Sequence, residues 1–174
     1  MDVQTIHFFL RVTARITFLF FLGAFTAPAL FALWPTPGIR WIEERRRGWV
    51  LAFAASHTAH LALIVMLARK LGGTAFLHQF TWVAVVVGGA VYLFIYALAA
   101  AAAFPVNLRG VLSPRFLTLA YYPVWFVFAL SYVGATVHSV FYLPFATAAI
   151  AALALRLVAA GRARRAGAFT IASR

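Results

Sequence analysis

Three histidines, His57, His60 and His138, lie within long apolar stretches of the sequence. Ionisable side chains at membrane depth are costly to bury, so they usually carry function. His57 and His60 are three residues apart and therefore share roughly one face of a helix. Neutral imidazoles ligate haem iron, zinc and copper. The chemistry that these residues suggest is therefore haem or metal ligation.

The residues around the histidines are small, so a flat, bulky group could lie against either helix face. These small residues are Ala52, Ala54, Ala55, Ser56, Thr58 and Ala59 near the first pair, and Gly134, Ala135 and Thr136 near His138. Two imidazoles from facing helices suit the two axial positions of a b-type haem, which needs no cysteine, and the chain has none. A closed zinc or copper site wants about four ligands, so it is disfavoured.

Composition indicates an integral membrane protein, because 65% of the 174 residues are hydrophobic and only 10% are charged. A hydrocarbon core about 30 Å thick is crossed by roughly 20 helical residues. We therefore predict an all-α bundle, one domain over residues 1–174, with the chain turning near Pro144 between its last two helices. The five predicted transmembrane helices are 16–34, 48–68, 80–104, 116–143 and 145–160.

The basic residues predict the orientation of the bundle. Counted on alternate sides of the five spans, eleven of the 15 Lys and Arg residues fall on one side and four on the other. The four are Arg11, Arg15, Arg69 and Lys70; the eleven are Arg40, Arg45, Arg46, Arg47, Arg109, Arg115, Arg156, Arg162, Arg164, Arg165 and Arg174. The positive-inside rule then places the N-terminus outside and the basic tail, residues 161–174, in the cytoplasm. We expect a multi-pass protein of the cell inner (plasma) membrane.

Several classes of function are disfavoured. The three acids, Asp2, Glu43 and Glu44, all lie outside the apolar runs, so no carboxylate pair is available within the membrane for acid–base catalysis. No glycine-rich phosphate-binding loop is present, so flavin or nucleotide chemistry would have to come from a partner. The net charge of +12 is explained by contacts with the lipid bilayer rather than with nucleic acid. No catalytic residue or catalytic domain is predicted.

Depth along the predicted helices favours one histidine pair. His60 lies nine residues from Arg69 and His138 six from Pro144, which puts them about 14 and about 9 Å from the outer boundary. His57 lies about one turn deeper and matches His138 less well, but a shift of three residues in either boundary reverses that order. We predict His60 and His138 as axial ligands of the haem iron, with His57 as the alternative to His60 and Gly134 leaving room for the macrocycle.

A resemblance to a known family rests on two segments. Arg45-Arg46-Arg47-Gly48 is followed by Leu51-Ala52-Phe53 and then Thr58-Ala59-His60-Leu61, and the aromatic stretch Tyr121–Tyr142 contains His138. The sequence resembles the ferric-reductase-like transmembrane family, which includes haem-bearing membrane subunits that supply electrons to periplasmic methionine sulfoxide reductase. The resemblance implies b-haem held between helices, electron transfer from a quinol or partner reductase to an outer acceptor, and His60 and His138 as outer-haem ligands. Trp125 stands where that family commonly has a further histidine, so one haem is implied.

Two other classes of function stay open. In the first, the chain is a non-enzymatic membrane subunit that packs within a larger complex, and each histidine only donates to a carbonyl or a Ser/Thr hydroxyl on a neighbouring helix. The second, a transporter of small solutes, is less favoured because the sequence has no inverted repeat and no intramembrane acid. If the purified protein is coloured and contains haem, electron transfer is favoured over both of these alternatives.

Overall fold

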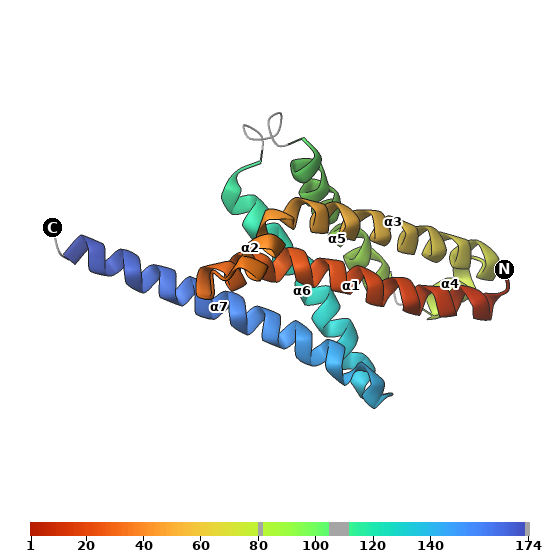
Figure 1. Ribbon diagram of the computed structural model, residues 1–174. Helices are drawn as coiled ribbons and strands as arrows, with labels where there is room; N and C mark the ends of the chain where they lie inside the picture. Colours follow the sequence, from red (N-terminus) through yellow and green to blue (C-terminus); the bar gives the residue numbers. More distant parts are fainter. Residues whose placement is uncertain (80–81, 105–111, 173–174) are drawn as a thin grey trace. The chain divides into compact units, whose positions relative to one another are not determined.

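The structure, a computed structural model, describes residues 1–79, 82–104 and 112–172, with the last side chains described as far as Arg165. Its elements are α1 (Val3–Leu33), α2 (Pro37–Glu44), α3 (Arg46–Leu71), α4 (Gly73–Gln79), α5 (Trp82–Ala103), α6 (Pro114–Thr136), η1 (Val140–Tyr142) and α7 (Leu143–Ala172) (Figure 1). Within these described ranges, five segments are long and apolar enough to cross a membrane: α1, α3, α5, α6 and the stretch Val140–Arg165. The predictions of an all-helical fold and of five apolar helices are therefore confirmed.

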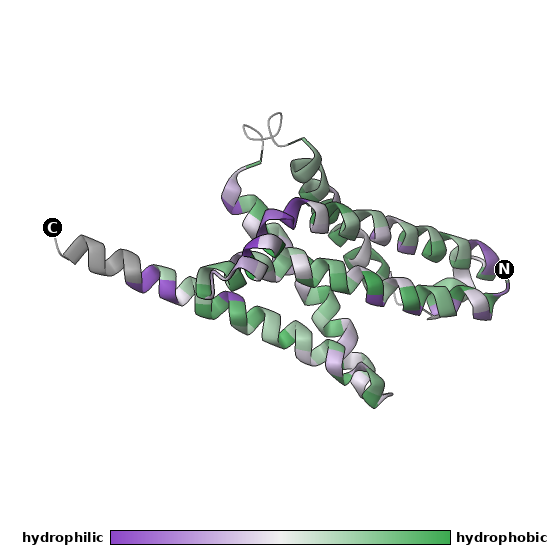
Figure 2. Ribbon diagram, viewed as in Figure 1, coloured by the Kyte–Doolittle hydropathy of each residue, from purple (hydrophilic) through white to green (hydrophobic). Residues whose placement is uncertain are grey.

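The chain forms two compact units. The first comprises Met1–Phe21 and Arg47–Val127, and the second comprises Leu22–Arg46 and Phe128–Arg174. The long helices are apolar over most of their length, and the strongly hydrophilic residues gather toward the ends of helices (Figure 2). His57 and His60 belong to the first unit and His138 to the second. Each unit therefore has to be considered separately as a source of ligands.

Helix α1 begins much earlier than the sequence predicts. The predicted start was residue 16, because Arg11 and Arg15 were expected to precede the span, but α1 starts at Val3. Asp2 caps the helix: its Oδ1 accepts a hydrogen bond of 2.7 Å from the backbone N–H of Thr5, which lowers the pKa of the Asp2 carboxyl. Arg11 and Arg15 consequently lie inside the helix and not before it.

The next two long helices agree with the sequence to within a few residues. Helix α3 exceeds the predicted 48–68 at both ends, and α5 falls within the predicted 80–104. Gly72 follows α3 with a φ of 79°, the left-handed conformation that ends many helices. Phe80, at the predicted start of α5, lies outside the described residues, as do Arg109 and Arg174 of the orientation count.

The turn before the last helix comes earlier than predicted. Helix α6 ends at Thr136 instead of residue 143, because the amides of Val137 and His138 bond to carbonyls three residues back and tighten the final turn. Ser139 then caps η1 by accepting from the amide of Phe141. Pro144 lies in the first turn of α7, where its missing N–H costs nothing. The fifth helix is therefore longer than the predicted 145–160.

Within the second unit, two arginines bind α1 next to Pro28. Proline lacks the N–H that would bond to the carbonyl four residues back, so the carbonyl of Ala24 has no helical donor. Nε of Arg46 donates to this oxygen at 3.3 Å. Nη1 of Arg156 donates to the next carbonyl, of Phe25, at 3.2 Å, and its guanidinium carbon lies 4.5 Å from the centre of the Phe25 ring. Arg156 therefore binds backbone inside its own unit.

Arg46 and Pro28 should be energetically coupled. Pro28→Ala supplies the missing amide for the Ala24 carbonyl, so Arg46→Met should cost about 1 kcal/mol less in the Pro28→Ala background than in the native protein. The measurement is the free energy of unfolding in detergent for the four proteins of the double-mutant cycle. Arg47→Met is the control, since Arg47 donates to the carbonyl of Ala103 at the end of α5, where no proline is involved. Equal costs of Arg46→Met in both backgrounds would refute the coupling.

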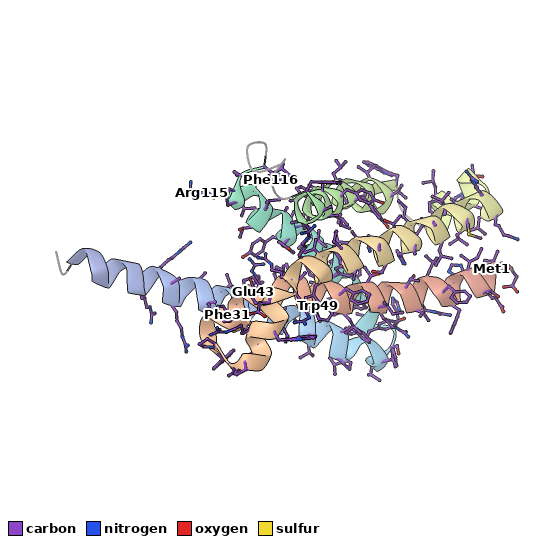
Figure 3. All side chains as sticks on the ribbon, turned by 45° about the horizontal axis from the view of Figure 1, so that its top comes forward. Met1, Phe31, Glu43, Trp49, Arg115 and Phe116 are labelled. Atoms are coloured by element: carbon purple, nitrogen blue, oxygen red, sulfur yellow. The ribbon has the colours of Figure 1, made fainter. Side chains whose placement is uncertain are left out.

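Glu43 is the partly buried acid of the short helix α2. The helix is capped by Thr36 and carries two aromatic–cation contacts, Arg45 over Trp41 at 4.2 Å and Arg40 over Phe31 at 5.8 Å. Figure 3 labels Glu43 on this helix and Phe31 near the end of α1. Within the described residues, Oε2 of Glu43 is buried and accepts no hydrogen bond. Burial raises the pKa of the Glu43 carboxyl, and the positive charge of Arg46 opposes that rise.

Stability should therefore depend on the ionisation of Glu43. A carboxyl whose folded pKa lies above its unfolded value favours folding at low pH, and this contribution is lost as pH rises through the folded pKa. Glu43→Gln should raise the melting temperature at neutral pH, and the gain should vanish below about pH 4, where the native side chain is protonated in both states. Thermal unfolding across pH measures this, with Glu44→Gln, a change at an exposed neighbour, as control. An equal effect of both changes would contradict the assignment.

Candidate functional site

Polar side chains join α1 to α3 within the first unit. The hydroxyl of Thr13 lies 2.8 Å from Nδ1 of His60, and the hydroxyl of Thr17 donates to that of Ser56 at 3.0 Å. One turn further on, the rings of Phe21 and Phe53 are 5.4 Å apart. Residue numbers rise along α1 as they fall along α3, so the two helices pack antiparallel. Thr17, Phe21 and Phe53 are fully buried.

Helix α5 contacts the other side of the histidine segment. The hydroxyl of Tyr92 donates to the backbone carbonyl of His57 at 3.4 Å, and the hydroxyls of Thr58 and Tyr96 are 3.1 Å apart. At the far end, the guanidinium of Arg47 donates to the carbonyl of Ala103 at 3.1 Å. Helices α3 and α5 are therefore antiparallel as well, and the histidine segment of α3 makes polar contacts with helices on two sides.

These alignments give the depth of the site. Arg47 and Ala103 lie at one level, and Ala68 and Trp82 each lie 21 residues from them, about 32 Å along the helix. This length matches a hydrocarbon core of about 30 Å. His60 is eight residues from Ala68, so it lies about 12 Å from that end.

The same alignment carries Arg11 and Arg15 to the level of His60. Thr13, which contacts His60, lies between the two arginines on α1. Lys70 exerts an electrostatic effect on Asp2, which agrees with the start of α1 lying beside the end of α3. The two arginines and His60 therefore share one depth, whereas the sequence predicted the arginines outside the membrane and His60 inside it.

The hydrogen bonds of Thr13 assign the tautomer of His60. A threonine hydroxyl has one proton to donate, and that of Thr13 lies 2.8 Å from the carbonyl of Phe9, one turn back in its own helix. With its proton used there, Thr13 accepts from Nδ1–H of His60. The lone pair of the His60 imidazole is then on Nε2, which makes no hydrogen bond within the described residues. An imidazole held in this way can ligate a metal through Nε2.

His57 is more enclosed than His60. Its ring lies 4.7 Å from the ring of Tyr92, 5.6 Å from that of Phe53 and 5.6 Å from that of His60, centre to centre. Its Nδ1 is buried. The His57 and His60 rings stack at 24° to each other, so the two imidazoles lie side by side on one face of α3.

The other predicted site residues belong to the second unit. His138 is exposed in the turn after α6, where its amide donates to the carbonyl of Ala135 at 3.1 Å. The sequence placed it inside a helix, about two turns from the end. Gly134 is exposed in the last turn of α6, and a β-carbon there would meet no atom within 4 Å.

No group of three or more His, Cys, Asp or Glu side chains able to hold a metal ion occurs among the described residues. Comparison of the chain with protein-family models, curated protein sequences and solved structures finds no match. The resemblance to the ferric-reductase-like family therefore stays a prediction from the two short segments that carry it.

Sequence reasoning missed the residues that orient the histidines. Thr13 was overlooked because it lies before the predicted start of the first helix, between two arginines assigned to the outer face. Tyr92 contacts His57 from α5, 35 residues away in the chain, so no local pattern pairs the two. A signal for Thr13 was present, since Thr13 and Thr17 are four residues apart and share a helix face with Ile6.

The Thr13 contact predicts the protonation of His60 in the apo protein. The ¹⁵N spectrum of histidine-labelled protein should show His60 with its proton on Nδ1, and Thr13→Val should return it to the mixture of tautomers found in free imidazole. Thr118→Val is the control, because the Thr118 hydroxyl bonds only to the carbonyl of Pro114 in its own helix. An Nε2–H tautomer of His60 in the native protein would show that the assignment is wrong.

Proposed function

We propose that this protein is the electron-transfer subunit of a membrane oxidoreductase, a b-type cytochrome-like chain that binds one haem with His60 as an axial ligand. One observation supports the proposal: the Thr13 hydroxyl lies 2.8 Å from Nδ1 of His60 and 2.8 Å from the Phe9 carbonyl, an arrangement in which His60 would donate through Nδ1–H and keep its lone pair on Nε2. A ligating histidine commonly donates its other ring N–H to a fixed acceptor, which sets the tautomer and the ring orientation. The bound haem would supply one-electron oxidation and reduction.

The residues around His60 have defined tasks in this proposal. Thr13 holds the imidazole in the ligating tautomer and orientation. His57, stacked on His60 and on Tyr92, restricts rotation of the ring. The fully buried rings of Phe21 and Phe53 keep water from the inner side of the site, so the surroundings of the iron would have a low dielectric constant. These are the contributions that a protein makes to the potential of a haem.

The second axial ligand is proposed from the sequence. His138 is the histidine that the spacing and the family resemblance assign to that position. His57 is the less suitable choice, because its ring stacks beside His60 instead of facing it. The electron donor is a quinol or a partner reductase and the acceptor lies at the outer face. The proposed location is the cell inner (plasma) membrane, with the N-terminus outside.

The proposal is tested by the visible spectrum. Protein purified in detergent after expression with a haem precursor should show a sharp, low-spin b-type spectrum when reduced, with about one haem per chain. His60→Ala and His138→Ala should each abolish that spectrum, whereas His57→Ala should keep most of it. Circular dichroism and the elution volume show whether each variant is folded. A colourless native protein, or full haem in both His60→Ala and His138→Ala, would refute the proposal.

A second function is favoured by the interhelical contacts themselves. Thr13–His60, Thr17–Ser56 and Thr58–Tyr96 each join two helices of the first unit, as expected of a small subunit whose polar side chains serve only packing. Such hydrogen bonds contribute about 0.6 kcal/mol each in membrane proteins. This alternative predicts a colourless, well-folded protein in which His60→Ala changes stability and assembly only.

A further inference from the structure

The short helix α2 lies at one boundary of the apolar length. Helix α1 ends at Leu33, just before α2, and Arg47, which bonds to the last carbonyl of α5, follows α2 by three residues. Three residues of extended chain reach at most about 10 Å, so α2 stays within that distance of the end of the apolar length. In a bilayer that covers this length, α2 lies in the headgroup region, on the side that the basic residues assign to the cytoplasm.

The residues of α2 and its C-cap divide into two faces. Ile39, Ile42 and Glu43 are half-buried, and they recur at the three- and four-residue spacing of one helix face. The other face is exposed. We call its four residues the α2 face: Arg40, Trp41, Glu44 and Arg45.

Both arginines of the α2 face rest on aromatic rings. The guanidinium carbon of Arg45 lies 4.2 Å from the centre of the Trp41 ring, and that of Arg40 lies 5.8 Å from the centre of the Phe31 ring. Within the part of the chain that the structure describes, neither guanidinium makes a hydrogen bond or an ion pair, with Glu44 or with any other residue. A guanidinium held over a ring keeps its N–H donors for another acceptor, and its fork matches the oxygens of a phosphate.

Further positive charge lies at the same level of the second unit. The segment Leu22–Leu33 of α1 and helix α7 run in the same direction (Figure 1), and Arg156 of α7 binds beside Phe25. Leu33 is eight residues beyond Phe25, about 12 Å along α1. An exposed basic cluster lies six to nine residues beyond Arg156, about 9 to about 14 Å along α7. The end of α1, where the chain enters α2, is therefore level with this cluster: Arg162, Arg164 and Arg165.

We propose that the α2 face binds the headgroup of an anionic phospholipid, with Arg40 and Arg45 on the phosphate. Trp41 is 49% exposed and Trp34, just before α2, is 50% exposed. Tryptophan prefers the boundary between headgroups and acyl chains, so these two rings select a lipid over a partner that docks from water. The two arginines outnumber Glu44, and the nearby basic cluster adds to them, so a negative headgroup is preferred to a zwitterionic one. This inference is independent of haem binding.

The experiment measures lipid binding to the full-length protein in detergent by native mass spectrometry. Phosphatidylglycerol and phosphatidylcholine with the same acyl chains are titrated separately. Native protein should bind its first phosphatidylglycerol about ten-fold more tightly than its first phosphatidylcholine, and Arg40→Gln/Arg45→Gln should lose that preference. Arg69→Gln/Lys70→Gln is the matched control, because it removes two exposed basic residues at the other end of α3, and it should keep the preference.

Three outcomes of the titration would overturn the proposal. The first is equal binding of the two lipids by the native protein. The second is an equal loss of preference in both double variants, because general charge and not the α2 face would then attract the lipid. The third is displacement of the lipid by inorganic phosphate at the same concentration, since a free phosphate would then suffice as the ligand.

A spin label tests the position of α2 in the native sequence background. The chain has no cysteine, so Glu44→Cys supplies a single labelling site on the α2 face. In vesicles that contain phosphatidylglycerol, a nitroxide at this site should collide with a water-soluble nickel chelate about as often as a nitroxide on a lipid headgroup does. A nitroxide that collides as freely as one in water would overturn the proposal, because the α2 face would then be open to a soluble partner.

Discussion

The interaction on which the first unit depends is the pairing of polar side chains between apolar helices. In hydrocarbon a hydroxyl or an imidazole has no water to bond, so each must find a partner in the protein. Thr13 meets His60, Thr17 meets Ser56 and Thr58 meets Tyr96. These contacts set α1, α3 and α5 in one register, and that register decides the depth and the tautomer of His60.

Arginines satisfy the same requirement in a different way. Arg47 bonds to the last carbonyl of α5, and Arg46 bonds to the Ala24 carbonyl, which has lost its amide donor to Pro28. In these two places a cation replaces a missing backbone N–H, and Arg156 bonds to the neighbouring carbonyl of Phe25.

The candidate haem ligand and the packing contacts share one histidine. His60 joins α1 to α3 through Nδ1, and the same bond leaves Nε2 free to ligate iron. Packing and ligation are therefore compatible uses of one imidazole, and either could be lost while the other persists. The ring of His57 lies against the rings of Phe53, His60 and Tyr92, so it packs where α3 meets α5.

The sequence alone determined the fold class. Long apolar runs with few charges are suited to lipid, and a helix in lipid satisfies its own backbone hydrogen bonds. It also located α3, whose apolar run is bounded by basic residues, and α5, whose apolar run is followed by a proline. It misjudged α1 and α6, since helix ends depend on capping contacts: Asp2 extends α1 past two arginines, and Ser139 starts the next helix before Pro144.

The tertiary structure determined which residues of different helices lie at the same depth along the bundle. Composition does not specify this. The sequence placed Arg11 and Arg15 outside and His60 inside, because each was measured from its own helix end. The hydrogen bond between Thr13 and His60 brings them to one depth, because antiparallel helices slide against each other until their polar groups pair. Register of this kind is a property of two segments far apart in the chain, so local sequence patterns do not encode it.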